Sequence, residues 1–547
     1  MKKNKGLLFA FILVNALSVA GCGFQSTSSN GSGGTFVPPK PNQEEDKPQE
    51  EEEPNPMDNL IYDEYDHAYD DLEVSEFNSK KSNITYQDFA KNSYYRLSVC
   101  PSVGNPKLLV IPIWFTDSSD YILYPENVRD DIETAFFGSE EETGWHSVSS
   151  YYTQDSFDTV HLEGVVTPWY ECGHSSEHYY NDSDYRTETL IKKAIDWYKS
   201  YLDVDALTSF DTDKDGYLDG VMVIYGAPDQ MASGNYNAGN LWAYTSWTLS
   251  ASSTYNPTVN AYFWSSYDFM YSRDAAISRS GSSYANGDTR HCNIDAHTFI
   301  HEMGHVFGLN DYYDYSGLSS PALSFSMQDE NVGGHDPFSR YSLGWAKAYH
   351  PQETVKIHLK PMEEGGEVIV LSANANTFGT PFHNYLMIEF YSPTGLNKFD
   401  SDHALKNRTA GPNSYGVRLW HVDSRLYSTN TGKTTGLPST GNVVHATGNS
   451  AGDRSTDLAG SSSYRQLTVI RKGYAFNDKD GGVYKDNRDE DSLTNSDLFT
   501  TGDYFTMGTY KNQFPRKEKL NTGYKLGWAI YFDEVNESGA TITLIKL

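Results

Sequence analysis

The sequence feature that most constrains this chain is the motif H-E-x-x-H at residues 301–305. Side chains four residues apart lie on one face of a helix, so a helix would bring His301 and His305 to a single metal ion. The apolar residues of the segment follow a helical period and cluster on the opposite face, within an arc roughly 120° wide. These residues are Phe299, Ile300, Met303, Val306 and Phe307. The segment therefore predicts a helix with one face in a core and the other at a metal site.

The residue types of the motif predict a catalytic zinc site. Neutral imidazoles bind Zn²⁺, and a catalytic site has three protein ligands with one position open for water. Glu302 is placed to take a proton from a metal-activated water. Gly308 allows a turn after the helix, and Asp311 is the expected third ligand, with Asp314 as the alternative. The alternative is that the motif occurs by chance in a solvated helix, which is expected on the order of a few per cent of the time in a chain of this length. The apolar arc and the glycine turn argue against this alternative.

A second motif, at residues 211–219, predicts a calcium loop. Carboxylates at alternate positions followed by Gly216 match the first half of an EF-hand loop. Met222 stands where the usual bidentate glutamate would be, and an apolar run at 221–225 begins where a second helix should. The pattern thus predicts a structural Ca²⁺ loop leading into a strand, with a turn of acids that binds no ion as the alternative. The expected calcium ligands are Asp211, Asp213, Asp215, Tyr217 through its backbone carbonyl, and Asp219.

The N-terminus predicts a lipoprotein. Residues 1–22 combine lysines, a short apolar run and the ending Val-Ala-Gly-Cys22, which resembles a bacterial lipobox. Lipidation of Cys22 would anchor the protein to the outer side of a bacterial membrane, at the cell surface. Cleavage without lipidation, and release from the cell, is the alternative. Residues 23–57 are rich in Ser, Gly, Pro and Glu, which predicts a disordered tether.

The acidic balance and the cysteines limit the partners. A formal net charge of −31 argues against nucleic acid and anionic membranes. We therefore expect membrane contact through the lipid anchor only, and a monomer. Besides Cys22 the chain has Cys100, Cys172 and Cys292, which allow at most one disulfide. Their spacing does not resemble a cysteine-rich zinc site, and their pairing stays open.

Hydrophobic patterns predict an α+β fold in two domains. Residues 58–105 are polar and weakly patterned, which is typical of an N-terminal strap or a short pro-segment. Residues 106–350 mix a buried strand at 108–115 with helical patterns and contain both metal motifs, so we expect a mixed sheet with an active-site helix. Residues 351–547 change to short alternating runs separated by turns, which predicts an all-β domain.

At these residues the chain resembles the immune inhibitor A family of secreted bacterial zinc metallopeptidases, over roughly residues 106 to 545. The resemblance implies a zincin-like, metzincin-related catalytic domain, zinc-dependent cleavage of extracellular proteins or peptides, and structural calcium. It implies that Met327 forms a Met-turn beneath the zinc without binding it. The chain departs from the family at 241–247, which lacks an expected histidine. The matching segments are 147–152, 165–170, the 211–219 loop, 301–315, 326–345, 385–389 and 416–423.

Three functions are compatible with these motifs. The first is a surface-anchored zinc endopeptidase. The second is a surface adhesin or glycan-binding protein with a non-catalytic zincin domain, and the third is a zinc hydrolase acting on another bond. Retention of Glu302 and of both histidines favours catalysis. The donor to the developing oxyanion could be Tyr312, Tyr313 or Tyr315, and the sequence does not choose among them.

Overall fold

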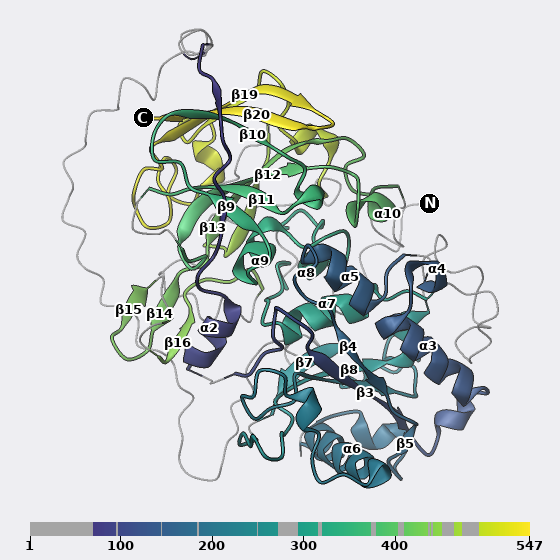
Figure 1. Cartoon of the computed structure of the whole chain (residues 1–547). Helices are drawn as coiled ribbons and strands as arrows, with labels where there is room; N and C mark the ends of the chain where they lie inside the picture. Colours follow the sequence, from purple (N-terminus) through teal and green to yellow (C-terminus); the bar gives the residue numbers. More distant parts are fainter. Residues whose placement is uncertain are drawn as a thin grey trace. The chain divides into compact units, whose positions relative to one another are not determined.

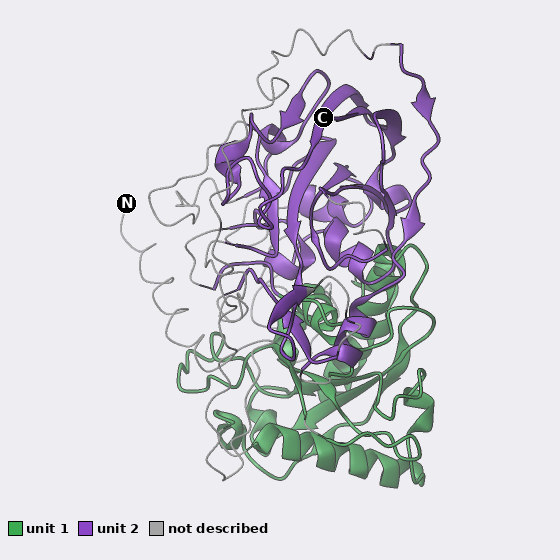
Figure 2. Ribbon diagram, turned by 90° about the vertical axis from the view of Figure 1, so that its left-hand side faces the viewer, with its two compact units in different colours: residues 1–25, 95–310, 403–410 green, residues 26–94, 311–402, 411–547 purple. Residues whose placement is uncertain are grey.

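The protein divides into two compact units (Figure 2). Unit 1 takes in residues 95–310, and unit 2 takes in residues 311–402 and 411–547 together with the N-terminal segment up to Tyr94. Among the described residues, no helix is both long and apolar enough to cross a membrane. Cys22, the tether and Cys292 lie outside those residues. The computed structural model describes Tyr69 and residues 71–94, 97–143, 145–182, 185–248, 250–271, 294–315, 320–373, 379–402, 410–435, 438, 441–450, 464–472 and 492–547.

Unit 1 is built on a six-stranded mixed sheet in the order β4-β3-β6-β8-β7, with β5 pairing beside β4 along β3. The strands β4, β3, β6 and β8 are parallel, whereas β7 at the edge runs antiparallel to β8. The central strands are apolar at successive positions because helices cover both faces of the sheet. The strands are β3 (Lys107–Trp114), β4 (Glu163–Val166), β5 (Tyr170–Glu171), β6 (Gly220–Tyr225), β7 (Tyr244–Trp247) and β8 (Ala261–Ser266).

The helices of unit 1 cover the two faces of this sheet (Figure 1). Leu190, Ile191 and Ile195 of α6 pack on one face, in a core shared with alternate residues of β3 and β6. On the other face, Phe299 of α7 contacts Phe263 of β8. Because side chains alternate along a strand, each face receives every second residue. The helices are α3 (Pro125–Phe137), α4 (Glu140–Thr143), α5 (Val148–Asp155), α6 (Arg186–Leu202) and α7 (His297–Val306).

Unit 2 contains three sheets and several short helices. Its two larger sheets have the orders β1-β10-β20-β19-β18 and β17-β13-β12-β11-β9-β2, and a small third sheet has the order β15-β14-β16. Apolar residues of the two larger sheets form one core. The helices are α2 (Tyr86–Asn92), α8 (Met327–Glu330), α9 (Pro337–Ser342) and α10 (Asn397–Asp402). The strands are β1 (Val74–Ser75), β2 (Lys80–Lys81), β9 (Lys347–Tyr349), β10 (Val355–Leu359), β11 (Glu367–Leu371), β12 (Asn384–Tyr391), β13 (Gly416–Asp423), β14 (Leu426–Ser428), β15 (Lys433–Thr435), β16 (Val443–His445), β17 (Leu467–Ile470), β18 (Tyr504–Thr506), β19 (Trp528–Asn536) and β20 (Gly539–Lys546).

The class of the protein is α+β with several mixed sheets. The compact units divide at residue 310, whereas the sequence predicts a domain boundary at 350. Strand β9 lies before residue 350 and pairs in parallel with β11. The short helices α8 and α9 also belong to the β-rich unit.

The N-terminal segment is an integral part of unit 2. Strand β1 pairs with β10 and strand β2 with β9, so each extends the edge of a larger sheet. Tyr86 of α2 is fully buried, and its ring lies 5.7 Å from Phe382 between centroids. Gln466 donates a hydrogen bond of 3.2 Å to the Tyr86 hydroxyl. Residues 71–94 thus act as a strap that stabilises the β-rich unit.

Replacing Tyr86 with alanine should therefore destabilise unit 2. We expect the free energy of unfolding to fall by about 3–5 kcal/mol, the usual cost of removing a large buried aromatic side chain. Urea titration followed by tryptophan fluorescence measures this change. Tyr524→Ala is the control, because Tyr524 is 65% exposed in the same unit and its loss should change the free energy by about 0.5 kcal/mol at most. Equal stability of the two variants would contradict the strap assignment.

Candidate metal centre

Helix α7 ends in a turn that only glycine adopts easily. Gly308 has φ of 103°, in the left-handed region. Its N–H donates to the carbonyl of His305 at 2.8 Å, and the N–H of Leu309 donates to the carbonyl of Gly304 at 3.0 Å. These bonds satisfy carbonyls that a helix end leaves without partners. The turn sends the chain back past the last helical residues, and Asp311 follows it directly.

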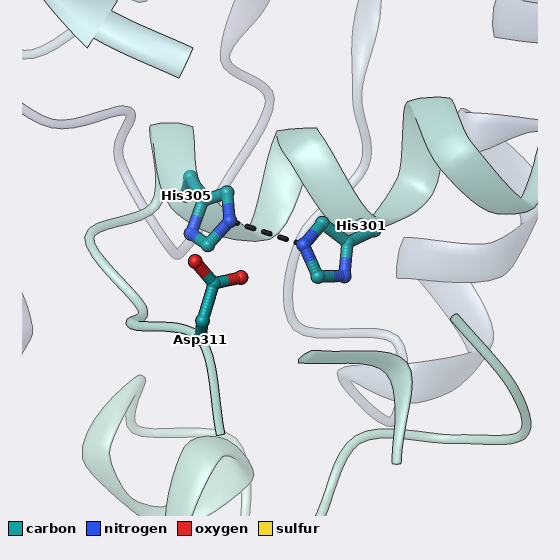
Figure 3. Close-up of side chains that lie close together, drawn as sticks. All are labelled: His301, His305 and Asp311. Atoms are coloured by element: carbon teal, nitrogen blue, oxygen red, sulfur yellow. Dashed lines mark hydrogen bonds between the residues drawn. The ribbon is translucent and has the colours of Figure 1, made fainter. Parts of the chain in front are cut away.

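The structure brings His301, His305 and Asp311 together (Figure 3). One ligand atom from each residue lies within 4.8 Å of the others, and all three residues are buried. The two Nε2 atoms are 3.1 Å apart. Two ligands of a tetrahedral Zn²⁺ at 2.0–2.1 Å would be separated by about 3.3 Å. A hydrogen bond between the two imidazoles would give a similar distance between the Nε2 atoms. That bond alone would not explain why the carboxylate of Asp311 lies beside both rings.

The backbone sets the tautomer of His305. Its Nδ1 lies 2.8 Å from the carbonyl oxygen of Leu309. A carbonyl only accepts, so Nδ1 carries the proton and donates it. Nε2 of a neutral imidazole then has a lone pair, directed towards His301. A second hydrogen bond of this kind commonly orients a metal-binding histidine.

The loop after the helix presents Asp311 and withdraws Asp314. Tyr315 donates a hydrogen bond from its hydroxyl to Oδ2 of Asp311. The carboxylate of Asp314 is fully buried and pairs with Arg465 across 3.5 Å. The guanidinium partner gives Asp314 a structural role in the interior of unit 2. Of the two acids that the sequence offers as third ligand, the structure brings Asp311 to the histidines.

Glu302 lies buried on the flank of the same helix, with 6% of its surface exposed. Its Oε2 is 3.0 Å from the hydroxyl of Thr245 in β7. Tyr152 of α5 donates to the carbonyl of Ile300 at 2.7 Å and ties α7 to its neighbour. The sequence assigns no role to Thr245 or Tyr152, although they lie in the segments 241–247 and 147–152 that were compared with the family. Their contacts join segments far apart in the chain, so local spacing does not reveal them.

The other predicted site residues, three tyrosines and one methionine, differ in burial and in the side chains that they contact. Tyr312 is fully buried, and its hydroxyl lies 3.0 Å from that of Ser339, so it has a structural partner. The rings of Tyr313 and Tyr315 lie 5.1 Å apart between centroids. Met327 is fully buried as the first residue of α8. Because the hydroxyl of Tyr315 already donates to Asp311, Tyr313 is the better candidate for an oxyanion donor.

The second motif forms a compact acidic loop. Oxygens of Asp211, Asp213 and Asp215 lie within 4.8 Å of one another. Gly216 has φ of 91°, and its N–H donates to Asp211 at 3.1 Å. The side chain of Asp215 accepts from the N–H of Tyr217 at 2.9 Å. The loop thus brings three carboxylates together, of which Asp211 is buried and Asp213 exposed.

Asp219 is held apart from this group. Its carboxylate accepts hydrogen bonds from the N–H of Lys107 and the hydroxyl of Thr212, both at 2.8 Å. Burial raises its pKa to about 6 despite these donors. The carboxylate therefore links the loop to β3. These contacts do not favour Asp219 as a calcium ligand, and the role of the Tyr217 carbonyl stays a prediction.

The whole chain was compared with protein-family models and with curated protein sequences, and neither comparison finds a match. The family resemblance therefore rests on the motifs in the sequence. Cys100 and Cys172 are free thiols, so they do not form a disulfide with each other.

The start of α7 packs against a cluster of aromatic and histidine side chains. The rings of Trp145 and His297 stack with centroids 3.9 Å apart, and Asp295 lies 2.7 Å from His297 Nδ1. His146 is next to them and only 5% exposed. Burial, with a smaller contribution from His297, lowers the pKa of His146 to about 4. The folded protein thus keeps His146 neutral over a range where an unfolded chain would protonate it.

Acidification should therefore weaken the fold through His146. The stabilising effect of neutral His146 is complete above pH 6.5 and is lost as pH falls towards 4, because the unfolded state binds the proton first. We expect wild type to lose about 3 kcal/mol more unfolding free energy than His146→Gln between pH 7 and pH 4. Urea titrations at several pH values measure the difference. His161→Gln, at a histidine whose side chain is 41% exposed, is the control and should follow wild type.

Proposed function

We propose that this protein is a zinc-dependent endopeptidase that cleaves extracellular proteins or peptides. The observation that carries the proposal is the convergence of His301, His305 and Asp311 next to Glu302. In this proposal residues 106–350 form a zincin-like catalytic domain, and a β-rich domain follows it in the chain. Lipid at Cys22 anchors the protein at the bacterial cell surface; this part rests on the lipobox alone.

The donor set fits Zn²⁺. Nε2 of each histidine and one oxygen of Asp311 would hold the ion, leaving one tetrahedral position open. Bound zinc supplies a Lewis acid for a carbonyl group and lowers the pKa of a water to about 7. Leu309 fixes the ring of His305, and Tyr315 fixes the carboxylate of Asp311. Both ligands are therefore oriented before an ion arrives.

Glu302 performs the proton transfers. As a carboxylate it accepts the proton of the attacking water, and as the acid it returns that proton to the leaving amine. Its position within the helix places it beside the histidines and not among the ligands. Tyr313 would donate to the oxyanion that forms on the scissile carbonyl.

The edge strand β7 supports a peptide substrate. Thr248 donates from its N–H to the carbonyl of Asn260 at 2.8 Å, which fixes the hydrogen-bonding register with β8. By alternation, the peptide groups of Thr245 and Trp247 face away from β8. Within the described residues, no strand pairs with that edge. An extended peptide can add to such an edge as a further strand, and this favours a peptidase over a hydrolase of other bonds.

Glu302→Gln tests the peptidase. We expect the variant to keep its zinc and its melting temperature but to lose at least about 100-fold in cleavage of casein, because the amide cannot take the proton. Glu126→Gln is the control, since that side chain is 78% exposed in unit 1. Undiminished cleavage by Glu302→Gln would refute the proposal. A zinc-loaded wild type that cleaves nothing but binds host glycans would favour the adhesin.

We also propose that the acidic loop at 211–215 binds structural Ca²⁺. Calcium at 100 times its dissociation constant should stabilise the wild type by about 2.7 kcal/mol relative to a sample with EGTA. Asp213→Asn keeps the size of the side chain and removes its charge, so most of this difference should disappear. Thermal unfolding with and without calcium measures it. Asp196→Asn is the control, with a side chain 77% exposed on α6. Identical curves for wild type in calcium and in EGTA would exclude the ion.

A further inference from the structure

We propose that Thr245 is a positioning residue that orients Glu302 for proton transfer. Thr245 lies in β7 and is fully buried. Its hydroxyl oxygen is 3.0 Å from Oε2 of Glu302 and 3.0 Å from the backbone carbonyl oxygen of the same residue. The inference rests on the proposed peptidase function and adds to it a residue outside the zinc motif.

The hydroxyl of Thr245 donates its hydrogen bond to the carboxylate of Glu302. A threonine has one O–H to donate, and both oxygens near it only accept. The carbonyl of Glu302 lies within α7, where the N–H four residues later is its regular partner. That helical N–H satisfies the carbonyl, so the hydroxyl donates to the carboxylate oxygen Oε2. Donation to Oε2 leaves the other carboxylate oxygen to exchange the proton with water and amine.

Thr245 is itself held firmly. In the register of the edge pair it lies opposite Phe263. Phe263 packs against Phe299 of α7 with centroids 5.3 Å apart, so this face of the sheet is the one that supports the helix. Two residues further along β7, Trp247 donates from its indole to the carbonyl of Ser98 at 3.1 Å. A β-branched side chain in a paired strand also has few rotamers. The donor is therefore fixed before substrate binds.

The position of Thr245 couples two parts of the reaction. Its side chain points to Glu302, while its peptide group faces the open edge of β7. A substrate strand added to that edge would be aligned by the same residue that orients the base. Misplacement of a catalytic group by about 1 Å can cost on the order of 100-fold in rate. Loss of the hydroxyl should therefore lower kcat and leave substrate binding nearly unchanged.

The test compares Thr245→Val, which keeps the shape and removes the donor, with Thr245→Ser, which keeps the donor. We expect Thr245→Val to lower kcat on a fluorogenic peptide by about 10- to 100-fold, with KM and zinc content unchanged. Thr245→Ser should recover kcat to within about threefold of wild type, because the hydroxyl is restored. Thr248→Val is the matched control. It removes a buried hydroxyl that donates to the Val259 carbonyl at 2.7 Å, next to the same strand, and should leave kcat unchanged.

The outcomes separate this inference from the proposed function. If wild type cleaves, Glu302→Gln does not, and Thr245→Val retains wild-type kcat, then the positioning role is wrong and the peptidase stands. An equal loss of kcat in Thr245→Val and Thr248→Val, or a loss of zinc in the former, would show a structural role only and would also overturn it. Should Thr245→Val fail to fold, Thr245→Ala provides the same comparison without a bulky substitute. A wild type that holds zinc and cleaves no peptide would overturn both proposals.

Discussion

The packing of Phe299 is the contact on which the candidate metal centre depends. Its ring lies 5.3 Å from the rings of both Phe136 and Phe263, measured between centroids. Aromatic pairs of this kind contribute about 0.5–1.5 kcal/mol each beyond the burial of their surface. The contact fixes the rotation of α7 about its axis. With one face committed to the sheet, the helix presents His301 and His305 on another face.

The packing of Phe299 does not by itself prevent α7 from sliding along its axis. Hydrogen bonds to the backbone of the helix provide that restraint. Tyr152 binds the carbonyl of Ile300 at 2.7 Å near the start, and the N–H of Cys100 binds the carbonyl of Val306 at 2.9 Å at the end. Each comes from a different part of unit 1. Groups that must act within a fraction of an ångström need this kind of support from rigid elements. The ten-residue helix is too short to be stable without it.

Sequence alone predicted what local spacing determines. The helix of the zinc motif, the Gly308 turn and the acidic loop all depend on residues within about one turn of each other, and all three form. What the sequence did not indicate depends on distant pairing. Thr245 reaches Glu302 across 57 residues, and β9 pairs with β11 across the boundary predicted at residue 350. Nothing in the spacing of residues encodes these contacts.

Both clusters of acids contain a buried carboxylate. Burying a carboxylate costs several kcal/mol unless donors or cations compensate it. Glu302 and Asp311 each have a hydroxyl donor, and Asp211 accepts two backbone N–H bonds. Neutral hydroxyl donors compensate a buried charge only in part, however, because they bring no opposite charge. The cations that we propose at these clusters would lower this cost further and would couple metal binding to stability.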